Sequence, residues 1–241
     1  MQKAVVNYMF EHSTLAAYDR DLNAGLSLSG ESRDHFARER VQWLRGCLRS
    51  AGLNKEQPAV MDFGCGPGAT LANLHEILNA RQVVGVDPSR SLLDVGRKMF
   101  HPPSFDLITP EEYSHTKAID VAYCNGVFHH LSDEERKSAV EFLFRILKPG
   151  GVLSLWENNP YSLAARWVMS RIPFDKDAEM VWPRSIIAIL RRRGFQLLRL
   201  DYLFVFPNLL HRFRWIEPFV SKAPFGAQYQ VFMVKGTHVI T

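Results

Sequence analysis

Three glycines that follow a short apolar segment allow the backbone to come close to a ligand. Gly64, Gly66 and Gly68 lie directly after an apolar run that contains Asp62. Glycine takes positive φ without strain and leaves room for a nucleoside beside the chain. The same spacing also satisfies the dinucleotide fingerprint, which is a weak signal by itself. The turn therefore indicates a nucleoside site without specifying the nucleoside.

A carboxylate about 20 residues further along the chain supports this interpretation. Asp87 directly follows the apolar run 82–86. At the end of a strand, a carboxylate can accept hydrogen bonds from both hydroxyls of a ribose. As an alternative, Asp87 caps the helix that is predicted to open at Pro88-Ser89. Its position at the end of a strand favours the ribose.

Two adjacent histidines and a later glutamate are the candidate catalytic bases. His129 and His130 follow the fourth predicted strand, and Glu157 ends the fifth. A base is needed only where the nucleophile must lose a proton of high pKa. Alternatively, the histidines form a structural turn before the helix capped at Ser132. Adjacent histidines are expected to point apart, and no set of carboxylates accompanies them, so we predict no metal site.

Polar side chains also follow the fifth strand into the same crevice. Asn158, Asn159 and Tyr161 come directly after Glu157, and we expect them to contact the acceptor of the reaction. For Asn159 the alternative is that it caps a helix over 160–170.

Alternating strands and helices must position these residues. Apolar runs predict strands at 59–63, 82–86, 104–108, 118–123, 151–156, 195–206 and 229–234. Helical patterns lie at 69–79, 88–100, 132–147, 160–170 and 184–193, with a tight turn at 148–151. This alternation predicts an α/β fold, with a parallel sheet covered by helices on both faces. The last two strands lack a helical crossover, which favours an antiparallel hairpin with 207–226 as its long connection.

Composition limits the class of protein. The 241 residues are 46% hydrophobic, which suits one large α/β domain. The net charge is +4, and acidic and basic residues interleave, so we expect no nucleic-acid partner. The run Arg191–Arg193 precedes Gly194 and reads as the last turn of a helix rather than a phosphate site. The three cysteines fit no zinc template or disulfide framework, and no run is long enough to span a bilayer. We therefore expect a cytoplasmic protein without stable membrane insertion.

Five motifs together resemble the class I S-adenosylmethionine-dependent methyltransferases. They are Met61–Gly68, Val84–Ser89, Ile119–Tyr123, Phe128–Leu131 and Leu147–Gly151, and they occur in the order typical of that family over residues 58–157. The resemblance implies a three-layer, Rossmann-like fold with seven strands, of which the last is antiparallel. The C-terminal part resembles, more loosely, bacterial enzymes that methylate sugars or secondary metabolites.

The resemblance also implies roles for single residues toward the cofactor. Asp62 and the loop from Gly64 through Cys65 and Gly66 to Gly68 would hold the methionine part. Asp87, with Pro88 and Ser89 beside it, would hold the ribose.

For the rest of the cofactor, the resemblance implies contacts from later turns and from the N-terminus. Glu111 or Glu112 would face the adenine amino group, although the turn here departs from the Gly-Asp-Ala type common in the family. Cys124 and Asn125 end the fourth strand under the sulfonium. Tyr18 would lie over the cofactor, because the N-terminal extension of similar enzymes closes the site.

The chain is accordingly interpreted as one domain in three parts. Residues 1–54 form a helical extension, 55–157 the cofactor-binding core and 158–241 the acceptor side. The segment 36–40 could contribute an arginine to the pocket, with a solvated helix face as the alternative. The apolar residues of 207–226 could pack on the body, form a homodimer, close the cavity or touch a membrane surface.

We therefore expect S-adenosylmethionine-dependent transfer of a methyl group to an oxygen or nitrogen of a small molecule, such as a sugar or secondary metabolite. The chain has Cys124-Asn125-Gly126 where the family's base and glutamine methylators have an Asn-Pro-Pro-Tyr motif. Two alternatives remain. One is a noncatalytic cofactor-binding module, and the other is an NAD(P)-dependent oxidoreductase that uses the same glycine turn.

Overall fold

The computed structural model describes residues 30–99, 105–169 and 179–236. Its centre is one seven-stranded sheet in the order β3-β2-β1-β4-β5-β7-β6. The strands are β1 (Ala59–Phe63), β2 (Gln82–Val86), β3 (Phe105–Ile108), β4 (Ile119–Asn125), β5 (Leu147–Asn158), β6 (Phe195–Leu203) and β7 (Gln228–Lys235). Only β7 runs antiparallel to its neighbours, β5 and β6, which confirms the predicted C-terminal hairpin.

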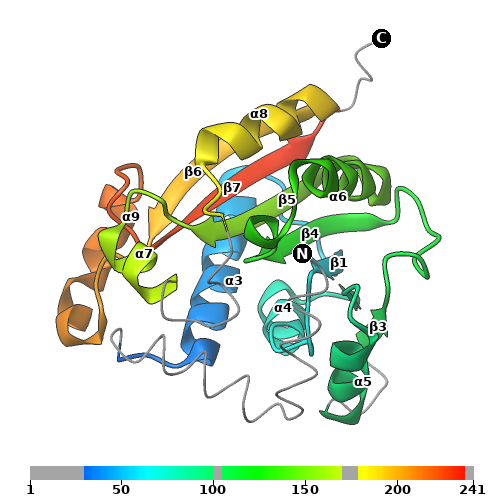
Figure 1. Cartoon of the computed structure of the whole chain (residues 1–241), viewed down its shortest axis with the longest axis horizontal. Helices are drawn as coiled ribbons and strands as arrows, with labels where there is room; N and C mark the ends of the chain where they lie inside the picture. Colours follow the sequence, from blue (N-terminus) through cyan, green and yellow to red (C-terminus); the bar gives the residue numbers. More distant parts are fainter. Residues whose placement is uncertain (1–29, 100–104, 170–178, 237–241) are drawn as a thin grey trace.

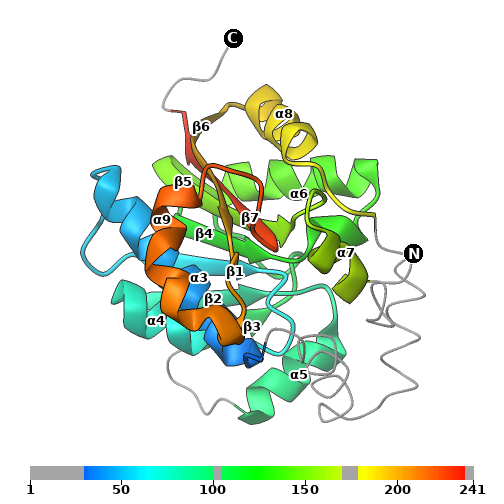
Figure 2. The same ribbon diagram turned by 90° about the vertical axis from the view of Figure 1, so that its left-hand side faces the viewer.

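Helices cover both faces of the sheet, as the alternating pattern predicts. The helices are α3 (Arg33–Ser50), α4 (Leu71–Leu78), α5 (Arg90–Met99), α6 (Asp133–Ile146), α7 (Leu163–Met169), α8 (Pro183–Arg193) and α9 (Glu217–Val220), with 3-10 turns η2 (Phe128–His130) and η4 (Asn208–Ile216). Figures 1 and 2 show α3 and α4 on one face and α6 and α8 on the other. Each face buries its own apolar core, because side chains alternate along the strands.

Local sequence signals explain where two of these helices begin and end. Ser132 and Glu135 form a capping box that opens α6, in which each side chain bonds the other's backbone N–H. Gly194 ends α8 in the left-handed region, with φ 109°, and its amide donates to the last turn. The three arginines before it lie in that last turn, which confirms the structural interpretation of this run.

The predicted tight turn at 148–151 is instead part of β5. The pairing of β4 with β5 shifts between Ile119↔Leu147 and Val121↔Val152, so the extra residues form an irregular bulge within the strand. Gly150 has φ 72° there. The bulge lets one continuous strand carry the predicted turn sequence.

The long connection between β6 and β7, residues 204–227, forms an arm that lies against α3. None of the residues in η4 and α9 is buried. Arg214 of the arm donates to Glu31 at 2.7 Å, and Asn208 donates to the carbonyl of Gly30 at 3.2 Å. Leu209 and Phe219 are 91% and 80% exposed on this arm. Within the described ranges, no helix is long and apolar enough to span a bilayer.

A buried carboxylate joins the first strand to the bulge of β5. Asp120 accepts hydrogen bonds from the backbone amide of Ala59 at 3.0 Å, from Lys55 at 2.8 Å and from Lys148 at 2.9 Å. Burial disfavours the charged carboxylate, but the bonds from Lys55, Ala59 and Lys148 outweigh burial and lower the pKa of Asp120 to about 2.

We expect Asp120→Asn to lower the free energy of unfolding by about 1–2 kcal/mol at pH 7. Since the pKa falls from 3.8 to about 2 on folding, this contribution is complete above pH 4 and is lost as the pH drops from about 4 to about 2. Urea unfolding at several pH values measures it. Curves for wild type and variant that stay parallel down to pH 2 would contradict the assignment.

Candidate functional site

The glycine turn and the end of β2 are held together by one side chain. The carboxylate of Asp87 accepts from the backbone N–H of Gly66 at 2.9 Å and from that of Ser89 at 2.8 Å. The amides of Gly64 and Cys65 both donate to the carbonyl of Val86. Asp87 therefore fixes the spacing of the two turns that border the predicted nucleoside crevice.

Gly64 is needed because the turns after β1 and β4 approach each other closely. It has φ 75°, a conformation that favours glycine. A Cβ at this position would lie 2.2 Å from Cγ2 of Val127. The two turns therefore make a narrow crevice at the carboxyl ends of adjacent strands, where α/β sheets bind their ligands.

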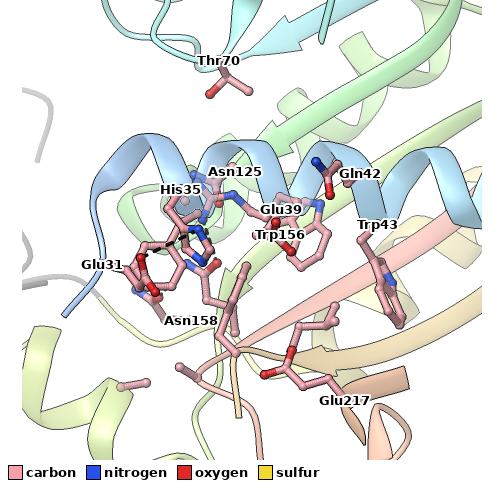
Figure 3. Close-up of a pocket in the computed structure, with 18 of the residues that line it drawn as sticks. Glu31, His35, Glu39, Gln42, Trp43, Thr70, Asn125, Trp156, Asn158 and Glu217 are labelled. Atoms are coloured by element: carbon pink, nitrogen blue, oxygen red, sulfur yellow. Dashed lines mark hydrogen bonds and ion pairs between the residues drawn. The ribbon is translucent and has the colours of Figure 1, made fainter. Parts of the chain in front are cut away.

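A cavity of about 910 Å³ opens at these strand ends, beneath α3 and the arm. Figure 3 shows Asn125, Trp156 and Asn158 around it, with Glu31 and His35 nearby on the α3 side. Seven predicted site residues line it: Asp62, Gly64, Cys65, Gly66, Asn125, His129 and Asn158. The others that the structure describes do not line it: Gly68, Asp87, Pro88, Ser89, Glu111, Glu112, Cys124, His130, Glu157, Asn159 and Tyr161. Tyr18 lies outside the described residues.

Two buried carboxylates make this end of the crevice electronegative. Asp62 is 3% exposed and Asp87 is 8% exposed. Burial and the neighbouring charge of Asp87 raise the pKa of Asp62 to about 7, although Arg40 and Arg33 offset part of the effect. Burial also raises the pKa of Asp87, against the hydrogen bonds from Ser89 and Gly66. A positively charged ligand would compensate both carboxylates.

Glu157 holds His129 in place under the turn after β4. Oε2 of Glu157 lies 2.6 Å from Nδ1 of His129, and Oε1 accepts from the amides of Val127 and Phe128 at 3.0 and 2.7 Å. Glu157 is 1% exposed and His129 is 4% exposed. Only His129 of this pair borders the cavity, so Glu157 is placed to orient the imidazole rather than to touch a ligand.

We had expected the two histidine rings to point apart, but they pack against each other. The rings of His129 and His130 are 4.0 Å apart between centroids and inclined at 49°. Both residues lie in the 3-10 turn η2, and His129 is the buried one of the two. Among the described residues, no group of three metal-ligating side chains is present.

The three polar residues after Glu157 have different surroundings. Asn158 lines the cavity and accepts from Gln228 at 3.2 Å. Asn159 is fully buried; it donates to the carbonyls of Pro224 and Gly226 and accepts from the amide of Tyr161. These contacts occupy its amide in holding the turn before β7, and Tyr161 is 48% exposed beside Trp182.

The two glutamates after β3 also differ from each other. Glu112 accepts from the backbone amide of Thr109 at 2.8 Å and from Arg90 at 2.9 Å. These bonds lower the pKa of Glu112. Glu111 is exposed on the same turn. The carboxylate of Glu112 thus closes the turn after β3.

Comparison with known proteins agrees with this geometry. Residues 60–151 match the model of a methyltransferase domain. The chain is 29% identical over 151 residues to the trans-aconitate 2-methyltransferase of Azoarcus sp., covering 63% of this chain and 58% of the relative. It is 32% identical over 120 residues to the enzyme of that name from Methylobacterium radiotolerans, covering 50% and 45%. The chain thus spans about half the length of the curated relatives it matches.

A solved structure shows the same fold. A SAM-dependent methyltransferase from Thermotoga maritima superposes with a TM-score of 0.59 at 19% identity, covering 95% of this chain and 98% of that one. The matched methyltransferase domain, the relatives and the shared fold together support a class I S-adenosylmethionine-dependent methyltransferase.

The residues of this site fit S-adenosylmethionine, the cofactor of such methyltransferases. The sulfonium and ammonium groups of that molecule are positive and suit the buried carboxylate of Asp62, and its ribose hydroxyls can donate to the carboxylate of Asp87. Asn125 adds an acceptor: its Oδ1 is buried and has no hydrogen-bond partner in the described part of the chain. A buried acceptor without a donor is costly, and a donor from the ligand would relieve that cost.

Among the cavity residues that were not predicted from the sequence, three come from the central strands. Tyr123, Trp156 and Gln228 all lie on the α3 face of the sheet and border the cavity. Arg40, within the segment predicted to supply an arginine, donates to Tyr123 and Gln228. A charged residue among the apolar positions of α3 was the signal for Arg40. The other three read as ordinary strand residues, because their role depends on which strands become neighbours.

We expect Asp62→Asn to stabilise the ligand-free protein while weakening cofactor binding. The folded pKa of Asp62, about 7, lies above its usual 3.8, so the ionised form opposes folding and stability falls as the pH rises from about 4 to about 7. The variant should gain on the order of 2 kcal/mol over wild type at pH 8 and less at pH 5. Chemical unfolding at both pH values measures this, and an equal difference at the two would refute it.

Proposed function

We propose that this protein transfers the methyl group of S-adenosylmethionine to an oxygen or nitrogen of a small molecule. The observation that carries the proposal is the pair of buried carboxylates, Asp62 and Asp87, at the ends of two adjacent strands. A nicotinamide dinucleotide would bring a negative pyrophosphate to the same turn, beside Asp62, whereas Asp87 suits the ribose of either cofactor. The electrostatics therefore favour a cationic nucleoside over the oxidoreductase alternative.

The protein contributes to the reaction mainly by positioning the acceptor and the methyl donor. The cofactor supplies an activated methyl group when bound. Aligning the acceptor with the donor can lower the activation free energy by about 7–11 kcal/mol. Asp87 would orient the ribose, and the turn from Gly64 to Gly66 with Asp62 would orient the methionine end. Asn125 at the end of β4 would lie near the reacting carbon, whereas Cys124, expected beside it, is buried in the core of the opposite face of the sheet.

His129 would act as the base where the acceptor is a hydroxyl. If Nδ1–H of His129 donates to Glu157, then Nε2 is the basic nitrogen of the ring. A carboxylate that fixes the tautomer of a histidine and stabilises its protonated form is a recurring arrangement for proton removal. We propose His129 as the catalytic residue and Glu157 as its positioning residue, with His130 packed against the ring.

For the acceptor we propose a sugar or a secondary metabolite that lies against Asn158. A carboxylate acceptor is a second candidate, because three relatives are named trans-aconitate 2-methyltransferases and Arg40 borders the cavity. Hydroxyl and carboxylate acceptors differ in whether they need a base. A hydroxyl must lose a proton of high pKa, whereas a carboxylate is already ionised and needs no base.

We expect Asp87→Ala to weaken binding of S-adenosylhomocysteine by about 10- to 100-fold, since charge-assisted bonds to the ribose are lost. Isothermal titration measures the affinity, and Asp94→Ala, an exposed carboxylate on α5, is the matched control. No heat with wild type at millimolar ligand would exclude the proposed function. Binding of NAD(P) in its place would support the oxidoreductase.

We expect His129→Gln to lower kcat for a hydroxyl acceptor by about 10²–10⁴-fold and to remove the acidic limb of the pH–rate profile, since the base is lost. Glu157→Gln leaves the imidazole in place, so it should lower kcat by less and displace this limb without removing it. Release of S-adenosylhomocysteine from a panel of sugars, polyols and carboxylic acids identifies the acceptor and gives the rates. His211→Gln, on the exposed arm, is the control. Unchanged profiles with a hydroxyl acceptor would show that His129 is not the base, and binding without turnover on any acceptor would support the noncatalytic alternative.

A further inference from the structure

Phe204, the first residue of the arm, has a backbone conformation that is uncommon for a bulky side chain. Its φ is 64°, in the left-handed region that favours glycine. Among the described residues, the other non-glycine residues with positive φ are polar: Gln57, Asn79 and Lys117. Residues held in such a conformation need surrounding contacts that fix them, and they are found most often at functional sites.

Contacts from the far end of the arm hold Phe204 in this conformation. The amide of Ala227 donates to the carbonyl of Phe204 at 3.2 Å. The carboxylate of Glu217 accepts from the next two backbone amides of the chain, at 2.9 and 3.1 Å. A Cβ on Gly226 would lie 2.2 Å from the carbonyl oxygen of Leu203, so only glycine lets the two ends of the arm approach this closely.

The left-handed conformation directs the ring toward the cavity. Successive side chains of an extended strand point to opposite faces of the sheet. Tyr202 packs in the core on the α6 face and Leu203 in the core on the α3 face, so further alternation would return residue 204 to the α6 face. Instead, Phe204 packs in the same core as Leu203 and borders the cavity.

Phe204 and Phe36 of α3 form an aromatic corner in the cavity wall. Their ring centroids are 4.9 Å apart, and the rings are inclined at 87°. Both side chains are half-buried and border the cavity. Trp156, which is fully buried, supports Phe204 with its ring centroid 6.3 Å away. Perpendicular rings offer a third ring one face to stack on and one edge to contact, which are the arrangements that aromatic rings prefer.

The aromatic corner lies on the acceptor side of the proposed site. In the strand order, β1 and β2 lie toward one edge of the sheet and β6 forms the other edge. Asp62 and Gly64 border the cavity at the end of β1, and Phe204 borders it at the end of β6. A cofactor that occupies the crevice at β1 and β2 leaves the corner for the second ligand.

Polar groups beside the aromatic corner already bond one another. Arg214 pairs with Glu31 at 2.7 Å, and the carboxylate of Glu217 accepts from two backbone amides. The indole N–H of Trp156 donates to Ser154 at 3.0 Å. A sugar carries hydroxyls around its ring and needs a hydrogen-bond partner for each one that it buries, whereas an aromatic ring needs none. The corner therefore suits an aromatic ring better than a sugar.

We infer that Phe36 and Phe204 bind a planar aromatic ring of the acceptor and select it over sugars and saturated rings. The inference rests on the proposed function and narrows its acceptor to an aromatic compound. Phe204 is then a specificity-determining residue, and the left-handed turn at the start of the arm is what places its ring in the cavity.

The test compares two alcohols of similar size that differ in planarity. The protein is saturated with S-adenosylhomocysteine and titrated with 2-naphthol, which is aromatic, or with decahydro-2-naphthol, which is saturated. Wild type should bind 2-naphthol about tenfold more tightly than the saturated alcohol, because stacked and edge-on contacts add to the burial of apolar surface. Methyl β-glucoside, a plain sugar, should bind more weakly than either.

Two variants remove one ring each. Phe204→Asn keeps a residue that tolerates the left-handed conformation, and Phe36→Leu keeps an apolar side chain on α3. Each should weaken 2-naphthol by about tenfold and leave the affinity for S-adenosylhomocysteine within about twofold. Lys117→Asn, which makes the same change in backbone preference at an exposed site outside the cavity, is the matched control and should change neither ligand. If Phe204→Asn does not fold, Phe36→Leu decides the question, because its backbone is helical.

Three results would overturn the inference: equal binding of the two naphthols by wild type, unchanged binding of 2-naphthol in the folded variants, or tighter binding of the glucoside than of 2-naphthol. Wild type that fails to bind S-adenosylhomocysteine would instead count against the proposed function. Titration of 2-naphthol into the ligand-free protein and its variants would then still test the aromatic corner.

Discussion

The carboxylate of Asp87 is the contact on which the site depends. It bonds the amide of Gly66 on one turn and the amide of Ser89 on the next, so it fixes the width of the crevice between β1 and β2. Parallel strands end at one edge of a sheet, but their turns need not keep a fixed distance. Asp87 provides that constraint from inside, and its burial also prepares an acceptor for a ligand hydroxyl.

The rest of the cavity is built on elements outside the matched methyltransferase segment, residues 60–151. Helix α3 precedes this segment, and β6, β7 and the arm follow it. Arg40, Gln228 and Arg214 come from these flanking elements. The matched segment thus carries the proposed cofactor side, and the flanking elements supply much of the remaining cavity wall.

Much of the scaffold could be predicted from the sequence because it follows from local pattern. The strands 59–63 and 82–86 match the structure residue for residue, since each is a short apolar run bounded by turn residues. The reversed β7 followed from a connection without a helical crossover. The bulge at 148–151 was missed, because a Pro-Gly-Gly sequence reads as a turn unless its neighbouring strand is known.

Site details depended on contacts between distant parts of the chain, which a sequence pattern does not contain. Asn159 was expected to meet an acceptor, but its amide bonds the backbone of Gly226, 67 positions away. Glu157 was a candidate base, yet it lies 28 positions from the histidine that it orients. By contrast, the glycine turn and Asp87 were recognisable because the backbone geometry that they require limits the residue types at each position.

The most direct test of the account is a crystal structure of the protein with S-adenosylhomocysteine. We predict that both ribose hydroxyls bond the carboxylate of Asp87 and that the amino-acid end lies in the cavity between Asp62 and α3. A nucleoside bound elsewhere, or one whose ribose makes no contact with Asp87, would contradict it.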